Sequence, residues 1–309
     1  MSGATRGHLL YNGRKVLLKY HRLLSGVHPH PPNSVTALRH VLADGAEAIE
    51  FDVGLTRDEQ YVLLHGAELE SETSGRGPLR QVTEAEFKAL RLRDSDEPPA
   101  TLAEVVAIVR EVGRPVKLQV DLKETAPLSS GVADRLLRAV ASMRENPSVS
   151  VIVGGMGDWN LRLLRRLDPA LAVGLDFANH LDAAVGDSVG LRTRVNAYGY
   201  LDDHPLGESR GAPARAYLEG RMEELLNLVP GAGEVYVRKE FLLQALGDGF
   251  NPIEFIHHHR PGALVDVWTL YAHEPNLERT VLAALDAGAD QLTSPTPVRL
   301  IETFEKMHG

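Results

Sequence analysis

The sequence contains no cysteine, and this absence excludes disulfide bonds and thiolate metal sites. No stretch approaches the roughly 20 consecutive apolar residues that a membrane-spanning helix needs. The first 15 residues also lack the apolar core of a signal peptide. Basic residues are fewer than acidic ones, with 33 Lys and Arg against 42 Asp and Glu. The resulting net charge of −9 argues against a large nucleic-acid interface. We therefore expect a cytoplasmic protein with no nucleic-acid partner and no stable membrane insertion.

What the sequence does contain is a regular alternation of short β-branched runs and longer helical patterns, which is typical of βαβ units around a parallel sheet. Its 309 residues suit one α/β barrel, a fold that commonly takes about 250 residues, so we expect a single domain over residues 1–309. Eight candidate strands favour a (β/α)8 TIM barrel, with a doubly wound, Rossmann-like sheet as the alternative. These candidates lie at 15–21, 48–53, 116–123, 149–155, 171–177, 234–240, 264–270 and 290–294.

Start and stop signals mark several of the intervening helices. Asn33 or Ser34 opens a helix that ends at Gly45, and Thr101 with Glu104 forms a capping box before another helix. Two connections, 66–100 and 178–212, are much longer than usual, and we interpret them as insertions at the C-terminal face of the barrel. The second contains the polar and aromatic segment 196–204, which we expect to influence the choice of substrate.

Reactive side chains gather where the predicted strands end, which is the catalytic face of such a barrel. Glu50 and Asp52 are two residues apart, so they point to the same face of their strand, and Asp121 and Lys123 repeat this spacing. Three carboxylates in one barrel mouth would repel one another unless a cation lay between them. Oxygen ligands without cysteine favour a hard divalent cation, Mg2+ or Ca2+, and leave nearby histidines free for proton transfer.

The order of motifs along the chain carries a specific resemblance. HR follows the first strand and PxNS precedes a helix. GAEAIEFDVGLTRD, a histidine after LL, TSGRG, TLAEV and VDLK follow, and WT ends the seventh strand. This series resembles the glycerophosphodiester phosphodiesterase family over essentially the whole chain. The resemblance implies a barrel enzyme of lipid metabolism that uses a divalent cation to cleave glycerophosphodiesters into a glycerol phosphate and an alcohol.

Position by position, the resemblance also implies roles for individual residues. Its metal ligands would be Glu50, Asp52 and Asp121, and its general acid and base would be His21 and His65. Arg22 and Lys123 would bind the phosphate. Trp268 would contact the substrate, unless its side chain only fills the core. Attack on phosphorus could come from a neighbouring substrate hydroxyl, through a cyclic phosphate, or from water, and the sequence leaves both routes open.

Four positions depart from the family pattern. Leu23 replaces a glycine, Pro32 a glutamate and Gly66 an aspartate, while Asp121 shortens the third ligand from glutamate. A side chain shorter by one methylene retracts the carboxylate by more than about one ångström unless the backbone compensates. Lys19 should also point into the barrel beside the carboxylates, because it lies two residues before His21.

These observations leave three functional hypotheses. The first is a metal-dependent phosphodiesterase acting on a glycerophosphodiester or a related lysophospholipid. The second is a lysine Schiff-base aldolase or lyase that uses Lys19 or Lys123. The third is a non-catalytic descendant of the family that binds a phosphorylated ligand on the same rim. Structural ion pairs, of Glu50 and Asp52 with Lys19 or Arg22, are the alternative to a metal site.

Overall fold

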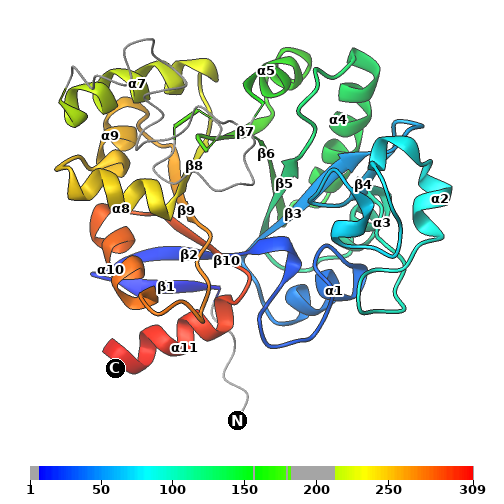
Figure 1. Cartoon of the computed structure of the whole chain (residues 1–309), viewed down its shortest axis with the longest axis horizontal. Helices are drawn as coiled ribbons and strands as arrows, with labels where there is room; N and C mark the ends of the chain where they lie inside the picture. Colours follow the sequence, from blue (N-terminus) through cyan, green and yellow to red (C-terminus); the bar gives the residue numbers. More distant parts are fainter. Residues whose placement is uncertain (1–6, 156, 179, 182–212, 309) are drawn as a thin grey trace.

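The protein is an eight-stranded parallel barrel surrounded by helices in the computed structural model, which describes residues 7–155, 157–178, 180–181 and 213–308 (Figure 1). Its strands are β2 (Arg14–Tyr20), β3 (Ala48–Leu55), β5 (Val116–Leu122), β6 (Val149–Gly155), β7 (Ala172–Asp176), β8 (Glu234–Arg238), β9 (Leu264–Trp268) and β10 (Gln291–Ser294). Parallel pairing of β2 with both β3 and β10 closes the barrel. The predicted fold and all eight predicted strands are confirmed.

Two further strands pair antiparallel with this barrel. β1 (His8–Tyr11) forms a hairpin with β2 through Asn12 and Gly13, whose φ angles of 48° and 77° suit a two-residue turn. β4 (Tyr61–Leu63) pairs with the end of β3. This second pairing matters for the site, because it returns the chain toward the barrel mouth just before His65.

Helices cover the outside of the barrel. Their bounds are α1 (Val35–Ala43), α2 (Glu84–Lys88), α3 (Leu102–Val109), α4 (Ser130–Arg144), α5 (Asp158–Leu167), α7 (Ala214–Leu228), α8 (Lys239–Gly247), α9 (Pro252–His259), α10 (Leu277–Ala287) and α11 (Pro297–His308). Ser34 caps α1 and Thr101 forms the expected capping box of α3 with Glu104. None of the described helices is long and apolar enough to cross a membrane.

The first long connection, 66–100, packs against β3 and β4. It contains the short 3-10 helices η2 (Leu69–Ser71) and η3 (Leu79–Gln81) as well as α2. Its apolar residues form a small core of their own with β4, made of Val62, Leu64, Leu69, Leu79 and Phe87. The segment 196–204 lies outside the described residues, as does most of the second connection.

Candidate active site

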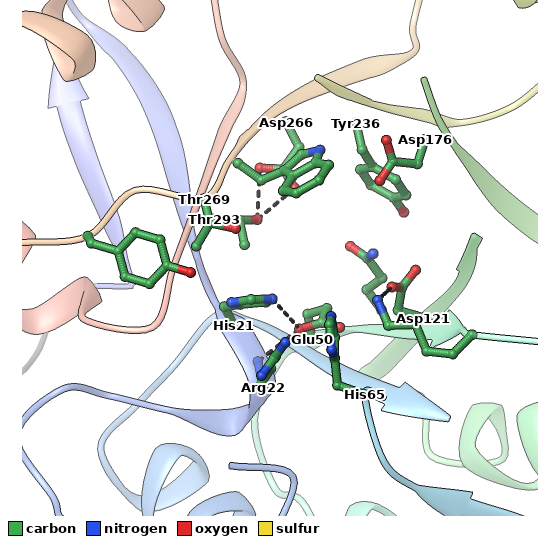
Figure 2. A pocket seen from close by; sticks show the side chains of 14 residues that line it. His21, Arg22, Glu50, His65, Asp121, Asp176, Tyr236, Asp266, Thr269 and Thr293 are labelled. Atoms are coloured by element: carbon green, nitrogen blue, oxygen red, sulfur yellow. Dashed lines mark hydrogen bonds and ion pairs between the residues drawn. The ribbon is translucent and has the colours of Figure 1, made fainter. Parts of the chain in front are cut away.

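A cavity of about 280 Å³ opens at the C-terminal ends of the barrel strands, where the sequence predicts the site (Figure 2). Its lining includes nearly all of the predicted site residues, and Asp52 lies buried directly behind it. The lining residues are His21, Arg22, Glu50, His65, Gln119, Asp121, Lys123, Asp176, Tyr236, Asp266, Trp268, Thr269, Tyr271 and Thr293. The barrel thus brings together side chains that are far apart in the sequence.

The three predicted metal ligands form one compact group. Glu50, Asp52 and Asp121 each place a carboxylate oxygen within 4.8 Å of the other two. The β3–β5 register sets Asp52 opposite Asp121, so both carboxylates leave the sheet at the same level. Asp121 therefore reaches the group despite its shorter side chain. Three oxygen donors at this spacing could hold a hard divalent cation.

The surroundings of this group shift the pKa values of Glu50 and Asp52 in opposite directions. Burial, with the negative charges of Asp52 and Asp121, raises the pKa of Glu50 well above its usual value. Burial opposes ionisation of Asp52 as well, but the positive charges around it, that of Lys123 first, together outweigh burial and lower the pKa of Asp52. Burial likewise disfavours the Lys123 ammonium, yet Asp121 and Asp52 raise its pKa. A bound cation would relieve the electrostatic cost of ionising Glu50, so these residues fit a metal site.

Both predicted catalytic histidines face the cavity in a neutral form. His21 lies in the 3-10 helix η1 (His21–Leu23), with its Nε2 atom 3.8 Å from Oε2 of Glu50. Burial lowers the pKa of His21 to about 3, and burial also lowers the pKa of His65 to about 4. At neutral pH each ring can therefore accept a proton.

The two predicted phosphate-binding cations are already engaged by carboxylates. Lys123 Nζ lies 2.9 Å from Asp52 Oδ1 and forms an ion pair with Asp121. Arg22 Nη1 donates to Glu72 at 3.3 Å, and Arg22 Nε lies 3.5 Å from Asp52. The backbone N–H of Arg22 also donates to Glu50 at 2.8 Å. Lys123 and Arg22 therefore hold these carboxylates in place, and both cations also line the cavity.

Trp268 and Lys19 occupy different levels of the barrel. Trp268 lines the cavity, and the Arg238 guanidinium lies 5.7 Å from its ring centroid. Lys19 points into the barrel as expected, but it does not lie beside Glu50. It pairs in register with Ala48, which is one inward-facing layer below Glu50, and its Nζ atom lies 2.7 Å from Asp266 instead.

The structure shows what two departures from the family pattern entail. Leu23, in place of glycine, is buried with a left-handed φ of 63°, a conformation that costs a leucine about 1–2 kcal/mol. At Gly66, a Cβ atom would lie 2.6 Å from the Ser71 hydroxyl oxygen. Nothing in the structure explains Pro32.

Sequence reasoning missed several residues of the site. Asn33 lies in the PxNS segment but was assigned only to the start of a helix, and no motif marks Glu72 or Asp176. Gln119 and Asp266 could have been found, because they lie two residues before Asp121 and Trp268 and so face the same way. Tyr236 on β8 and Thr293 on β10 also line the cavity.

Comparison with known proteins identifies the family. Residues 21–185, more than half of the chain, match the model of the glycerophosphoryl diester phosphodiesterase family. The chain belongs to this family.

Relatives of this family match at low identity. A glycerophosphodiester phosphodiesterase of Caldanaerobacter subterraneus subsp. tengcongensis is 26% identical over 151 residues, which are 47% of this chain and 60% of that protein. The match therefore spans less than two thirds of that relative's length. A probable glycerophosphodiester phosphodiesterase 1 of Mycobacterium tuberculosis is 26% identical over 59% of this chain and 73% of its own length.

Solved structures of family members share the fold over nearly the whole chain. A putative glycerophosphodiester phosphodiesterase from Galdieria sulphuraria superimposes with a TM-score of 0.66 at 18% identity, covering 93% of this chain and 97% of that chain. A phosphodiesterase from Oleispira antarctica, solved with the product sn-glycerol-3-phosphate, superimposes with a TM-score of 0.60 at 17% identity, covering 93% and 96%. These likenesses show the barrel fold.

Proposed function

We propose that the protein is a phosphoric diester hydrolase that cleaves glycerophosphodiesters into a glycerol phosphate and an alcohol. The observation that carries this proposal is the placement of Glu50, Asp52 and Asp121 beside the neutral imidazoles of His21 and His65 in one cavity. Family membership supports the same reaction. So does the glycerol phosphate bound to the Oleispira antarctica phosphodiesterase.

A divalent cation, Mg2+ or Ca2+, would be held by Glu50, Asp52 and Asp121. When bound, it would supply positive charge to the phosphoryl oxygens and lower the pKa of an attacking hydroxyl group. The chemistry of the donor set supports this assignment, since all three donors are oxygens and the pKa of Glu50 is raised by burial and neighbouring negative charge.

The chain's own residues would handle the protons and the remaining charge. His21 and His65 would serve as the general base and general acid, and each reaches the cavity from a different strand end. The imidazole that accepts the nucleophile's proton becomes cationic, and the phosphate charge beside it favours this form. Arg22 and Lys123 would bind the phosphoryl oxygens, and Trp268 would contact the rest of the substrate.

The Schiff-base hypothesis finds little support in this geometry. Lys19 is 1% exposed, and its ammonium is held by Asp266 and by Gln119 at 2.5 Å. Lys123 is held by Asp52 and Asp121. A nucleophilic lysine needs a free, uncharged amine, whereas both ammonium groups here are stabilised by carboxylates.

The cytoplasmic location expected from the sequence stays a prediction.

The test is hydrolysis of a panel of glycerophosphodiesters and lysophospholipids with Mg2+, Ca2+ or EDTA, by the wild type and by Glu50→Gln and His21→Ala. We expect metal-dependent release of glycerol phosphate, reduced at least about 100-fold in either variant. His258→Ala is the matched control, because this histidine is exposed at the end of α9. No turnover by a folded wild type would reject the proposal and favour a non-catalytic binding role, whereas metal-independent turnover would reject the proposed metal site.

A further inference from the structure

Glu72 is a buried carboxylate behind the part of the cavity wall that Arg22 and His65 form. The residue is 8% exposed and does not line the cavity, although Arg22 and His65 do. Figure 2 shows Arg22 and His65 on the side of the cavity where Glu50 lies. A glutamate is almost never buried without a partner, because its charge is costly to remove from water. The partners of Glu72 therefore indicate what its carboxylate does at this position.

The two carboxylate oxygens of Glu72 have different partners. Oε1 accepts a hydrogen bond from Nη1 of Arg22 at 3.3 Å, and Oε2 accepts one from the backbone N–H of His65 at 3.3 Å. One carboxylate thus connects η1, which follows β2, with the segment that follows β4. Burial raises the pKa of Glu72, and the charge of Arg22 opposes this shift. The ion pair with Arg22 therefore helps to keep Glu72 charged in a buried position.

The first long connection, 66–100, fixes the backbone of Glu72. The residue caps η2, where its N–H donates to the carbonyl of Leu69 at 3.3 Å. The carbonyl of Glu72 accepts a hydrogen bond from the N–H of Arg93 at 2.8 Å. Leu69 is 1% exposed in the small core that this connection forms with β4. The insertion therefore holds the Glu72 carboxylate on a packed support.

Arg22 has a second carboxylate within reach, and that one belongs to the proposed metal site. Its Nε atom lies 3.5 Å from Oδ2 of Asp52, which is fully buried. A cation bound by Asp52 repels the guanidinium, because both are positive. Glu72 is outside the group formed by Glu50, Asp52 and Asp121, so its charge stays with Arg22 when a cation is bound. Without Glu72, the guanidinium would be left with the carboxylate that the cation also needs.

We propose that Glu72 is a positioning residue that holds the Arg22 guanidinium toward the phosphoryl group while a cation is bound at Asp52. This inference rests on the proposed function, because that function assigns Arg22 to the phosphoryl oxygens. A guanidinium that is fixed before the reaction stabilises the charge that develops on these oxygens in the transition state. Glu72 therefore acts on kcat through Arg22 and does not touch the substrate.

The first test is a double-mutant cycle with Mg2+ and the diester that the wild type hydrolyses fastest. Its variants are Glu72→Gln, Arg22→Met and the combination of both. Glu72→Gln keeps the size of the side chain but removes the charge and one acceptor oxygen. We expect it to lower kcat at least about tenfold while KM changes less than about threefold. In the Arg22→Met background, the same substitution should change kcat/KM less than about threefold.

Two outcomes of this cycle overturn the inference. One is a wild-type kcat in Glu72→Gln. The other is a further tenfold loss, or about that, when Glu72→Gln is added to Arg22→Met, because independent residues give additive effects. If Glu72→Gln does not fold, Glu72→Asp replaces it with the same expectations, because this variant keeps the charge but retracts the carboxylate by more than about one ångström.

Glu70→Gln is the matched control. Glu70 also lies in η2, is exposed, and accepts a hydrogen bond from the backbone N–H of Gly77 at 2.8 Å. Both variants thus remove a carboxylate that bonds a backbone N–H, but only Glu72 is paired with Arg22. We expect Glu70→Gln to keep the wild-type kcat within about twofold. An equal loss of kcat in Glu70→Gln overturns the inference, because the effect would then come from η2 as a whole.

Phosphate binding separates this inference from the proposed function, because it requires no hydrolysis. Binding of inorganic phosphate is measured by titration calorimetry with Mg2+ present. Removal of a negative charge near the site would by itself tighten the binding of an anion, whereas loss of the Arg22 position weakens it. We expect Glu72→Gln to bind phosphate at least about threefold more weakly than the wild type. Tighter or unchanged binding overturns the inference.

The two measurements together distinguish the possible failures. Weaker phosphate binding by Glu72→Gln, without hydrolysis of any diester by the wild type, would refute the proposed function and leave the role of Glu72 standing. Hydrolysis by the wild type, with an unchanged kcat in Glu72→Gln, would refute the role of Glu72 alone.

Discussion

Asn33 and Asp52 hold each other by a pair of hydrogen bonds. Asn33 Nδ2 donates to Asp52 Oδ2 at 2.8 Å, and the Asp52 backbone N–H donates to Asn33 Oδ1 at 3.2 Å. Asn33 reaches this position with a left-handed φ of 55°, a conformation that asparagine tolerates better than most residues. Because Oδ2 of Asp52 is fixed in this way, its carboxylate presents a constant orientation to Glu50 and Asp121. Asn33 is therefore a positioning residue for the proposed metal site.

Removal of this support should weaken metal binding. Asn33→Gly deletes both side-chain hydrogen bonds while it keeps the left-handed backbone at no steric cost. We expect the affinity for Ca2+ or Mg2+, measured by titration calorimetry, to fall about 10- to 100-fold. Asn12→Gly is the control, since Asn12 also has a left-handed φ, of 48°, but lies in the β1–β2 turn. Equal affinities in Asn33→Gly and Asn12→Gly would contradict the positioning role.

The barrel could be predicted from the sequence because most of its strands are short runs rich in apolar residues that are followed by a helical pattern. β1 and β4 were not predicted as strands, since each is short and is stabilised by pairing with one neighbour rather than by a pattern of its own. The turn at Asn12 and Gly13 was a signal for the β1–β2 hairpin. A local apolar pattern thus predicts the repeated units of the barrel, whereas β1 and β4 form because each pairs with the barrel strand next to it in the chain.

The site could be predicted where strand alternation, strand ends or the family motifs apply. Glu50, Asp52, Asp121 and Lys123 were found because residues two apart on a strand share a face. The contacts of Asn33 depend on how the loop after β2 folds over β3, which no spacing encodes. The level of Lys19 depends on the β2–β3 register, which places it opposite Ala48 rather than Glu50. Register is a tertiary property, so the sequence placed Lys19 on the correct face but in the wrong layer.

Divalent cations should stabilise the folded protein. A cation at about 100 times its dissociation constant raises the free energy of unfolding by about 2.7 kcal/mol, and EDTA should abolish this gain. Glu50→Gln should lose most of it in thermal unfolding with and without Ca2+ or Mg2+. The metal-free variant at pH 7 should instead be more stable than the wild type, by about 1–3 kcal/mol, because a buried carboxylate with a raised pKa is costly to ionise.

Asp176→Asn provides the comparison for this prediction. Asp176 lines the same cavity but does not belong to the group formed by Glu50, Asp52 and Asp121. Its variant should keep the metal-induced rise in melting temperature. A rise that survives in Glu50→Gln and disappears in Asp176→Asn would relocate the metal to the β7 side of the cavity.

Acid should destabilise the metal-free protein through its buried histidines. The pKa of His65 is lowered by burial from 6.5 to about 4, so the folded state binds its proton less readily than the unfolded state does. The stability that this difference contributes is complete above about pH 6.5 and is lost as the pH falls toward 4. We expect His65→Gln to flatten the dependence of the urea unfolding free energy on pH in this window. His258→Gln, at an exposed position, should leave the slope unchanged, and a wild-type slope in His65→Gln would contradict the prediction.

Lys19 is the centre of a buried ion network beneath the cavity. Its ammonium donates to Gln119 at 2.5 Å and Asp266 at 2.7 Å, and lies 3.3 Å from Glu234. Asp266 in turn accepts hydrogen bonds from the Thr293 hydroxyl at 2.7 and 3.0 Å. Every one of these groups comes from a different strand, so the network ties opposite sides of the barrel together.

Loss of the Lys19 ammonium should therefore affect stability more than catalysis. Lys19→Met leaves Asp266 buried without its cation, and we expect the free energy of unfolding to fall by about 3–5 kcal/mol. Lys15→Met on the same strand, where the lysine is 51% exposed beside Glu47, should cost less than about 1 kcal/mol. The double variant Lys19→Met with Asp266→Asn should regain part of the loss, because it removes the unpaired charge. An undiminished stability of Lys19→Met, together with complete loss of turnover, would instead make Lys19 a catalytic amine and revive the Schiff-base mechanism.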